Sequence, residues 1–82
     1  MSAVRDVVEV LARALTDKPD QVEVRESQYR ATTLVELFVA PGELGKVIGK
    51  QGRTAAALRT LAATAGEKEG KTVTLEIRDG KP

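Results

Sequence analysis

Two glycines and several basic residues lie close together near the middle of the sequence, in Lys46-Val47-Ile48-Gly49-Lys50-Gln51-Gly52-Arg53. Gly49 and Gly52 have no Cβ, so they permit a positive φ and let another backbone come near. An alanine-rich stretch follows, and a helix beginning there would present free N–H groups and a partial positive charge. With the charges of Lys50 and Arg53, this pattern suits a phosphate ligand.

Several known glycine motifs compete for this stretch. The spacing from Gly45 to Lys50 is one residue short of the nucleotide-binding P-loop, and Gln51 stands where that loop needs a serine or threonine for magnesium. The GxxxG pair at Gly45 and Gly49 has meaning only in an apolar membrane helix, whereas lysines flank it here. A helix-hairpin-helix leaves the predicted strands unused, and a plain helix-to-helix turn leaves the cluster of positive charges without a role.

Composition limits what the ligand and the chemistry can be. The chain has 82 residues, 41% hydrophobic and 30% charged, with a net charge of +1, so any attraction for nucleic acid must come from a local patch. It has no cysteine and no histidine, which removes thiol nucleophiles, disulfides and the usual zinc ligands. We therefore expect a binding protein that is not an enzyme and has no cofactor or metal.

The N-terminus and the apolar runs predict where the protein works. Met1-Ser2-Ala3-Val4-Arg5-Asp6 is polar by its sixth residue, and no apolar run approaches the length needed to cross a bilayer. We therefore expect no signal peptide, no transmembrane helix and no membrane partner. The predicted location is the cytoplasm.

The N-terminal segment has the apolar spacing of an amphipathic helix. Ser2 is the expected N-cap, and the helix should end before Lys18 because Pro19 disfavours helical geometry in the residue ahead of it. The side chains expected on its inward face are Val4, Val7, Val8, Leu11 and Leu15.

Two strands are expected next, because the apolar period changes to two. Gln21 to Arg25 buries only alternate residues, which suits an edge strand, whereas Thr33 to Ala40 is apolar on much of both faces, which suits a central strand. Glu26 to Thr32 should connect them as a hairpin loop, although this segment contains neither glycine nor proline.

Two helices should flank the glycines, and a last strand should follow them. Glu43 to Ile48 is expected to form a short helix that Gly49 ends in the αL conformation. The second helix should run from Arg53 to Ala65, with Gly66 just beyond its end, and the last strand from Thr72 to Arg78. The side chains expected on the inward face of this second helix are Ala55, Leu58, Leu61, Ala62 and Ala65.

The order helix, strand, strand, helix, helix, strand fixes an α+β fold class. A strand that returns through helices favours a right-handed crossover to a parallel neighbour. We therefore expect a three-stranded mixed sheet with three helices on one face. The connection would place the glycine loop at the tip of a helix pair.

The stretch Val47-Ile48-Gly49-Lys50-Gln51-Gly52 between a short helix and a longer one resembles the V-I-G-x-x-G signature of the KH domain. The αββααβ order is similar to the bacterial type II form, and the resemblance covers residues 1–82 as a single domain. Val39-Ala40-Pro41 and the stretch from Gly45 to Thr54 particularly resemble the small single-KH proteins of the KhpA family, also called YlqC.

The resemblance implies that the GXXG loop clamps single-stranded RNA. Gly49 and Gly52 would let the RNA backbone lie against the loop, and the N–H groups of Gln51, Gly52 and Arg53 would meet phosphates. Bases would lie between the helix pair and the last strand, and Arg59 is a weaker candidate further along the helix. The implied RNA-binding residues are Lys46, Val47, Ile48, Gly49, Lys50, Gln51, Gly52 and Arg53.

The family resemblance also implies a biological role and protein partners. It suggests an RNA chaperone or post-transcriptional regulator, linked to cell elongation and division through a larger KH-containing partner. Because Phe38 and Tyr29 are the only aromatic residues, base stacking should contribute little and affinity should be modest. The alternative is a dimerisation module with little RNA affinity of its own, in which the chain pairs with a copy of itself or with the larger partner.

Overall fold

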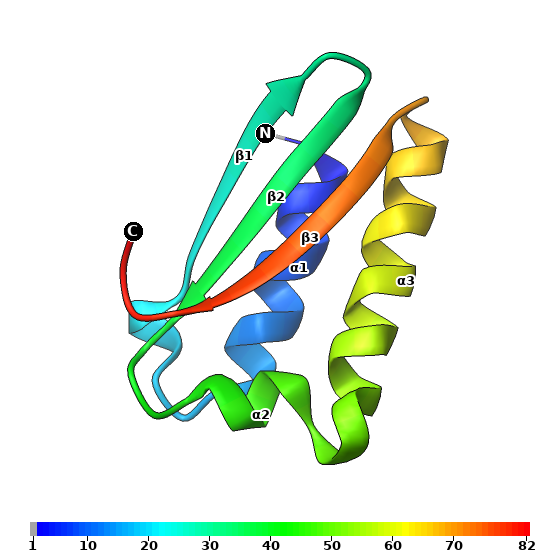
Figure 1. Ribbon diagram of the computed structural model, residues 1–82. Coiled ribbons are helices and arrows are strands. Elements are labelled where there is room, and N and C mark those ends of the chain that lie inside the picture. Colours follow the sequence, from blue (N-terminus) through cyan, green and yellow to red (C-terminus); the bar gives the residue numbers. More distant parts are fainter. Residues whose placement is uncertain (1) are drawn as a thin grey trace.

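The strands form one mixed sheet in the order β1-β2-β3, in which β2 is central (Figure 1). β1 pairs antiparallel to β2, and β3 pairs parallel to β2, as the sequence predicts. The computed structural model describes residues 2–82. Its strands are β1 at Glu23–Tyr29, β2 at Thr32–Val39 and β3 at Thr72–Asp79.

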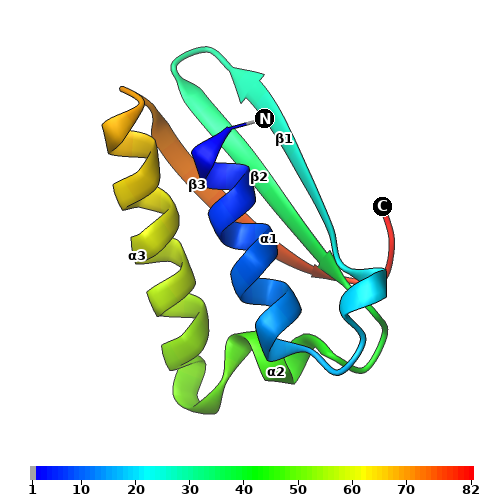
Figure 2. The same cartoon turned by 180° about the vertical axis from the view of Figure 1, so that it is seen from behind.

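The helices form a second layer on one side of the sheet (Figures 1 and 2). α1 and α3 lie side by side against the sheet, and α2 lies at the end of the layer where β2 leaves the sheet. No helix in residues 2–82 is long and apolar enough to cross a membrane. The helices are α1 at Ala3–Leu15, α2 at Leu44–Ile48 and α3 at Arg53–Lys68, with single 3₁₀ turns at Pro19–Gln21 and Lys50–Gly52.

The hydrophobic core lies between the sheet and this helical layer. Along β2, Val35 and Leu37 point into the core and are fully buried. Val4 and Val8 of α1, with Leu58 of α3, pack against them from the helical side. The alternation predicted for the second strand is therefore confirmed, because its inward residues are those that the helices cover.

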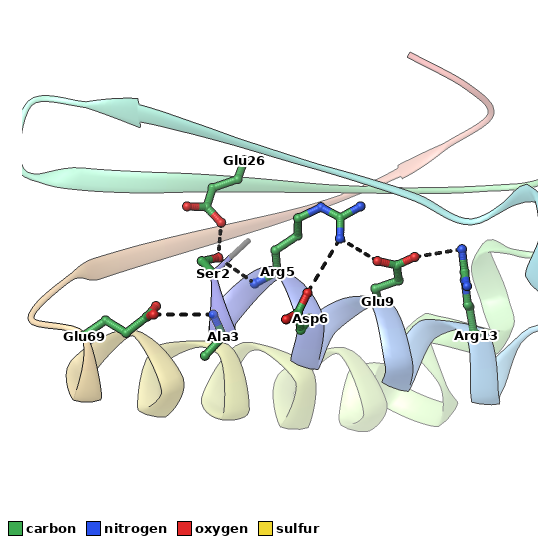
Figure 3. Close-up of polar contacts among 8 residues, drawn as sticks. All are labelled: Ser2, Ala3, Arg5, Asp6, Glu9, Arg13, Glu26 and Glu69. Carbon is green, nitrogen blue, oxygen red and sulfur yellow. Dashed lines mark hydrogen bonds and ion pairs between the residues drawn. The ribbon is translucent and has the colours of Figure 1, made fainter.

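Polar contacts fix the first turn of α1 to the middle of β1 and to the end of α3 (Figure 3). The Ser2 hydroxyl accepts a hydrogen bond from the Arg5 N–H at 3.1 Å, which confirms the predicted N-cap, and it donates to Glu26 of β1. The Ala3 N–H donates to Glu69, just beyond α3, at 3.4 Å. Carboxylates near a helix N-terminus also interact favourably with its dipole. This end of α1 is therefore held to both the sheet and α3.

The hairpin is longer than the sequence predicts. The expected loop from Glu26 to Thr32 is mostly strand, and only Arg30 and Ala31 turn the chain. Cross-strand pairing explains the difference, since Tyr29 lies opposite Thr32 and the Thr33 hydroxyl donates to Gln28 at 2.8 Å. A polar segment can extend an edge strand because its side chains stay in water.

The two predicted inward faces are only partly right. Leu15 and Leu61 are 37% and 46% exposed, so neither belongs to the core. The buried face of α1 is centred on Val4, Val8 and Ala12, and that of α3 on Leu58 and Ala62. Apolar spacing alone predicts that every apolar residue on a broad stripe of each helix is buried, whereas the sheet covers only the middle of that stripe.

The prediction that Gly66 ends the second helix is wrong. α3 continues to Lys68, and Gly70 supplies the positive φ of +70° that ends it. The Lys71 N–H bonds the Gly66 carbonyl at 2.8 Å, and the Gly70 N–H bonds the Glu67 carbonyl at 3.0 Å, which is the Schellman arrangement. Gly66 is instead buried where the helix approaches Val73 of β3.

Substituting Gly66 should therefore destabilise the fold. A Cβ at Gly66 would overlap the Val73 side chain and lie 3.1 Å from the Lys71 carbonyl, whereas a Cβ at Gly45, in α2, meets nothing. Both Gly66→Ala and Gly45→Ala gain helix propensity, so their difference isolates the overlap. We expect Gly66→Ala to be less stable than Gly45→Ala by about 1–3 kcal/mol in urea unfolding, the usual cost of overpacking. Equal stabilities would show that the contact is not tight.

Candidate nucleic-acid interface

The glycine loop lies at the turn between α2 and α3, at the end of the molecule opposite the β1–β2 hairpin tip (Figure 1). Three of its residues have a positive φ: Gly49 at +76°, Gln51 at +56° and Gly52 at +72°. Gly49 has a ψ of 175°, so it is not in the predicted αL conformation but in an extended region that is open essentially only to glycine. The αL residues are Gln51 and Gly52.

The two glycines have different structural roles. A Cβ at Gly49 would overlap the Thr54 hydroxyl and lie 2.7 Å from Thr54 Cβ, so the loop closes on the first turn of α3 at this point. A Cβ at Gly52 would have no neighbour within 4 Å. Gly49 is therefore required by packing as well as by conformation, whereas Gly52 is required by its φ and leaves open space above the loop.

The tight turn uses two of the three N–H groups that were expected to meet phosphates. The Gly52 N–H bonds the Gly49 carbonyl at 3.2 Å, and the Arg53 N–H bonds the Lys50 carbonyl. A 3₁₀ turn satisfies its own donors in this way. In this conformation the side-chain charges and the open surface at Gly52 remain for a phosphate, together with the first turn of α3, which has no side-chain cap.

The loop carries cations without counterions. Lys50, Gln51 and Arg53 are exposed, and the Arg53 guanidinium donates to the Gln51 side chain at 3.0 Å. Within residues 2–82, neither Lys50 nor Arg53 forms an ion pair. Their charges are therefore available to an anionic ligand.

Lys46 is in a different environment from the other basic residues of this stretch. Its ammonium forms ion pairs with Asp17 and with Glu43, the latter at 3.0 Å. These two carboxylates raise the pKa of Lys46. Because they outnumber its single charge, Lys46 adds little positive potential near the loop, and its contact with RNA stays a prediction.

Glu43 is the centre of a network that joins the end of α1 to the start of α2. Its side chain is 8% exposed and accepts hydrogen bonds from the Thr16 hydroxyl and from the Asp17 N–H at 2.8 Å. The bond from Thr16, with the bonds from Lys46 and the Asp17 N–H, lowers the pKa of Glu43 to about 2. Sequence reasoning missed this network because Thr16 and Asp17 lie far from Glu43 along the chain.

The apolar pair Val47 and Ile48, at the end of α2, comes just before the loop. Val47 is fully buried in the core, so it holds α2 in place and does not itself reach a ligand. Ile48 is half-buried at the end of α2, next to Gly49. Both α2 and α3 contact β3, which brings the helix pair beside the last strand.

Arg59, the weaker RNA-binding candidate, lies on the flank of α3 that faces β3. Gly66 packs against Val73, so this flank of α3 faces β3. Arg59 lies seven residues earlier, two helical turns away, and therefore on the same flank. It is exposed and, among the described residues, forms no ion pair. The spacing from Arg53 along the helix does not show which flank Arg59 occupies relative to β3, because the position of β3 is known only from the structure.

Neither aromatic residue can stack on a base held at the loop. Phe38 is 6% exposed, and Tyr29 lies at the hairpin end of β1, where Arg30 covers its ring at 5.6 Å from the centroid. The described residues contain no group of three or more acidic, histidine or cysteine side chains that could hold a metal ion.

Comparisons with known proteins agree with this architecture. The family described as "KhpA/KhpB, KH domain" matches residues 5–77. The RNA-binding protein KhpA of Aquifex aeolicus is 54% identical over 94% of this chain and 98% of its own, and that of Caldanaerobacter subterraneus is 51% identical over 88% and 96%. A crystal structure of Aquifex aeolicus Era, variant Y63A with GDP and AlF4−, matches with a TM-score of 0.60 and 18% identity. It covers 94% of this chain and 30% of Era, and supports the fold alone.

The Glu43 network should make stability depend on pH in acid. The unfolded chain protonates Glu43 near the ordinary pKa of 4.5, whereas the folded chain does so at about 2. Between these values the unfolded state binds more protons, so stability falls as the pH falls. We expect Glu43→Gln to lose part of this acid dependence in urea unfolding series from about pH 5 to pH 2. Glu67→Gln, which removes an exposed carboxylate near the end of α3, should keep it. An unchanged profile for Glu43→Gln would contradict the role of the network.

Proposed function

Because the chain belongs to the KhpA/KhpB family of KH domains, we propose that it binds single-stranded RNA through the loop from Gly49 to Gly52. The observation that supports this most directly is the contrast among its cations. Lys50 and Arg53 carry uncompensated charge beside an open glycine surface, while Lys46 is neutralised. The protein is then a binding protein and not an enzyme.

The binding mode follows from the same features. RNA phosphates lie over Gly52, where no side chain blocks a polymer backbone, and Lys50, Gln51 and Arg53 contact them from the two sides. Arg59 continues the contact along the flank of α3 that faces β3. Ile48 contributes apolar surface near the bases, and Val47 and Lys46 keep α2 in position.

Without stacking aromatic side chains, affinity for each site is modest and sequence preference is loose. These properties suit an RNA chaperone or post-transcriptional regulator that works in the cytoplasm on many transcripts. The family resemblance supports a link to cell elongation and division through a larger KH-containing partner. One KH domain spanning residues 1–82 is enough for the binding step.

A second candidate role is protein assembly. Val10 and Leu61 are large apolar side chains that remain 66% and 46% exposed on the helical layer. Exposed apolar residues that lie together often mark protein interfaces. This role does not exclude RNA binding, since the loop lies at the end of the layer and not on its outer face (Figure 2).

Reversing the charge of the loop should abolish much of the RNA binding. Lys50→Asp with Gln51→Asp lowers the net charge by three and places carboxylates against the phosphates, so we expect at least about a tenfold loss of affinity for single-stranded RNA. The matched control is Arg30→Asp with Ala31→Asp, which makes the same charge change at the hairpin tip, at the other end of the molecule (Figure 1). Fluorescence anisotropy measures affinity, and circular dichroism checks folding. Unchanged affinity in the loop variant, or equal losses in both, would refute the proposed site.

The dependence of RNA affinity on salt concentration should distinguish the unpaired cations, such as Lys50, from Lys46, which is ion-paired. Three phosphate contacts from Lys50, Arg53 and Arg59 predict a slope of log K against log salt of about −2 on a single strand. Lys50→Gln should reduce its magnitude by about 0.7, whereas Lys46→Gln should change it less, because Asp17 and Glu43 already balance the Lys46 charge. A larger change for Lys46→Gln would assign the phosphate contact to Lys46 instead.

A further inference from the structure

A cluster of three charged residues lies on the α2 side of the glycine loop. The Lys46 ammonium contacts the Glu43 carboxylate at 3.0 Å and also pairs with the Asp17 carboxylate. Asp17 follows the end of α1, which lies beside α2 (Figure 2). Two carboxylates therefore face one ammonium, and the cluster has an excess of negative charge about one helical turn before Gly49. We refer to Asp17, Glu43 and Lys46 as the Lys46 cluster.

The two carboxylates of the Lys46 cluster have different surroundings. Glu43 is 8% exposed and also accepts hydrogen bonds from the Thr16 hydroxyl and the Asp17 N–H, so it is part of the fold. The Asp17 side chain is 77% exposed, and Lys46 is its one partner among the described residues. The bond from Asp17 to Glu43 comes from the backbone and does not need a carboxylate. An exposed ion pair adds little stability, so the fold does not account for the Asp17 side chain.

Asp17 lies where it affects a phosphate more than it affects the fold. A lysine ammonium has three hydrogen-bond donors, and Glu43 takes one of those of Lys46. The Lys46 side chain is 43% exposed, so its ammonium is within reach of a ligand from solvent. Asp17 is the more exposed partner of the pair, and a phosphate that approached Lys46 would have to displace its carboxylate.

We propose that Asp17 is a specificity-determining residue, which masks Lys46 and so ends the RNA contact at the α2 side of the loop. This inference rests on the proposed RNA-binding function and deepens it. The strand then runs from the loop along the α3 flank that carries Arg59 and does not continue over α2. Its footprint stays close to the roughly four nucleotides that a KH loop clamps.

The neighbourhood of Asp17 supplies a matched control. Asp20 is an exposed carboxylate in the 3₁₀ turn three residues later and, within residues 2–82, forms no ion pair. Contact with Lys46 is therefore particular to Asp17 and is not shared by every acidic residue of this connection. Removing either carboxylate changes the net charge equally, but only the loss of Asp17 uncovers the lysine.

Removing the Asp17 carboxylate should tighten RNA binding. In Asp17→Asn, one added phosphate contact raises the magnitude of the salt slope by about 0.7, which corresponds to about three- to fivefold tighter binding at about 0.1 M salt. Asp20→Asn should change affinity by less than about twofold and leave the slope as in wild type, because it adds no contact. Fluorescence anisotropy with an oligouridine, in a salt series, measures both quantities. An unchanged slope in Asp17→Asn, or equal changes in the two variants, would overturn the proposal.

A double-mutant cycle tests whether Asp17 acts through Lys46. In the wild-type background Lys46→Gln should change RNA affinity little, because the lysine is masked. In the Asp17→Asn background the same change should remove the whole three- to fivefold gain, which makes the two substitutions strongly non-additive. A gain that survives in the double variant would assign the effect to the neighbouring Lys18 or to the general field, and would contradict the masking of Lys46.

The length of the RNA tests whether Asp17 sets the end of the footprint. An oligouridine of about four nucleotides fills one KH loop, so it can reach an unmasked Lys46 only by giving up a contact on the α3 side. A strand of about eight nucleotides keeps both contacts. We therefore expect the gain in Asp17→Asn on the longer strand and less than about a 1.5-fold gain on the shorter one. Equal gains on both lengths would show that Asp17 does not limit the footprint.

Stability and the loop variant separate this inference from a structural role and from the proposed RNA-binding site. Asp17→Asn should lower the melting temperature by less than about 5 °C, as the loss of an exposed ion pair does. RNA binding that falls in Lys50→Asp with Gln51→Asp but does not respond to Asp17→Asn would refute the masking and leave the loop standing. A gain in Asp17→Asn that persists after the loop is changed would refute the loop. Absence of RNA binding by every variant and by wild type would refute both.

Discussion

The parallel pairing of β2 with β3 is the constraint on which the rest of the structure depends. A chain that leaves β2 must travel back along the full sheet before it can enter β3 in the same direction. β3 has 8 residues and is about 26 Å long, and α3 has 16 residues and is about 24 Å long, so one helix makes the return. The reversal that begins this return is the glycine loop, which is why the loop lies at an end of the molecule and is exposed.

The glycine loop, where the chain reverses, depends on backbone conformation, packing and charge. The chain must turn sharply between α2 and α3, and Gly49 allows this because its φ of +76° and its contact with Thr54 both exclude a side chain. The Glu43 carboxylate holds the start of α2 to the end of α1, so the loop projects from a fixed base. The same network removes Lys46 from the set of free cations. Lys46 is thus ion-paired, whereas Lys50, in the loop, has no ion pair among the described residues.

The two flanks of α3 have different surroundings, which bears on the two roles proposed for so small a chain. One flank faces β3 and carries Arg59, and the other faces α1 and carries Leu61. Gly66 lets the helix approach β3 closely on the first flank, while α3 carries no charged residue between Thr60 and Gly66. The two proposed surfaces can therefore lie on one helix without overlapping.

The sequence by itself determined the element order, the central position of β2, the N-cap at Ser2 and the glycine loop as the place to look for a ligand, because these depend on local periodicity, capping and spacing. Only the tertiary structure decided the surroundings of each residue. It showed that Lys46 pairs with Asp17 and Glu43, that Gly66 serves packing and does not end the helix, and that Leu61 lies outside the core. Each of these depends on which distant segment lies opposite, and residue spacing along one helix or strand does not contain that information.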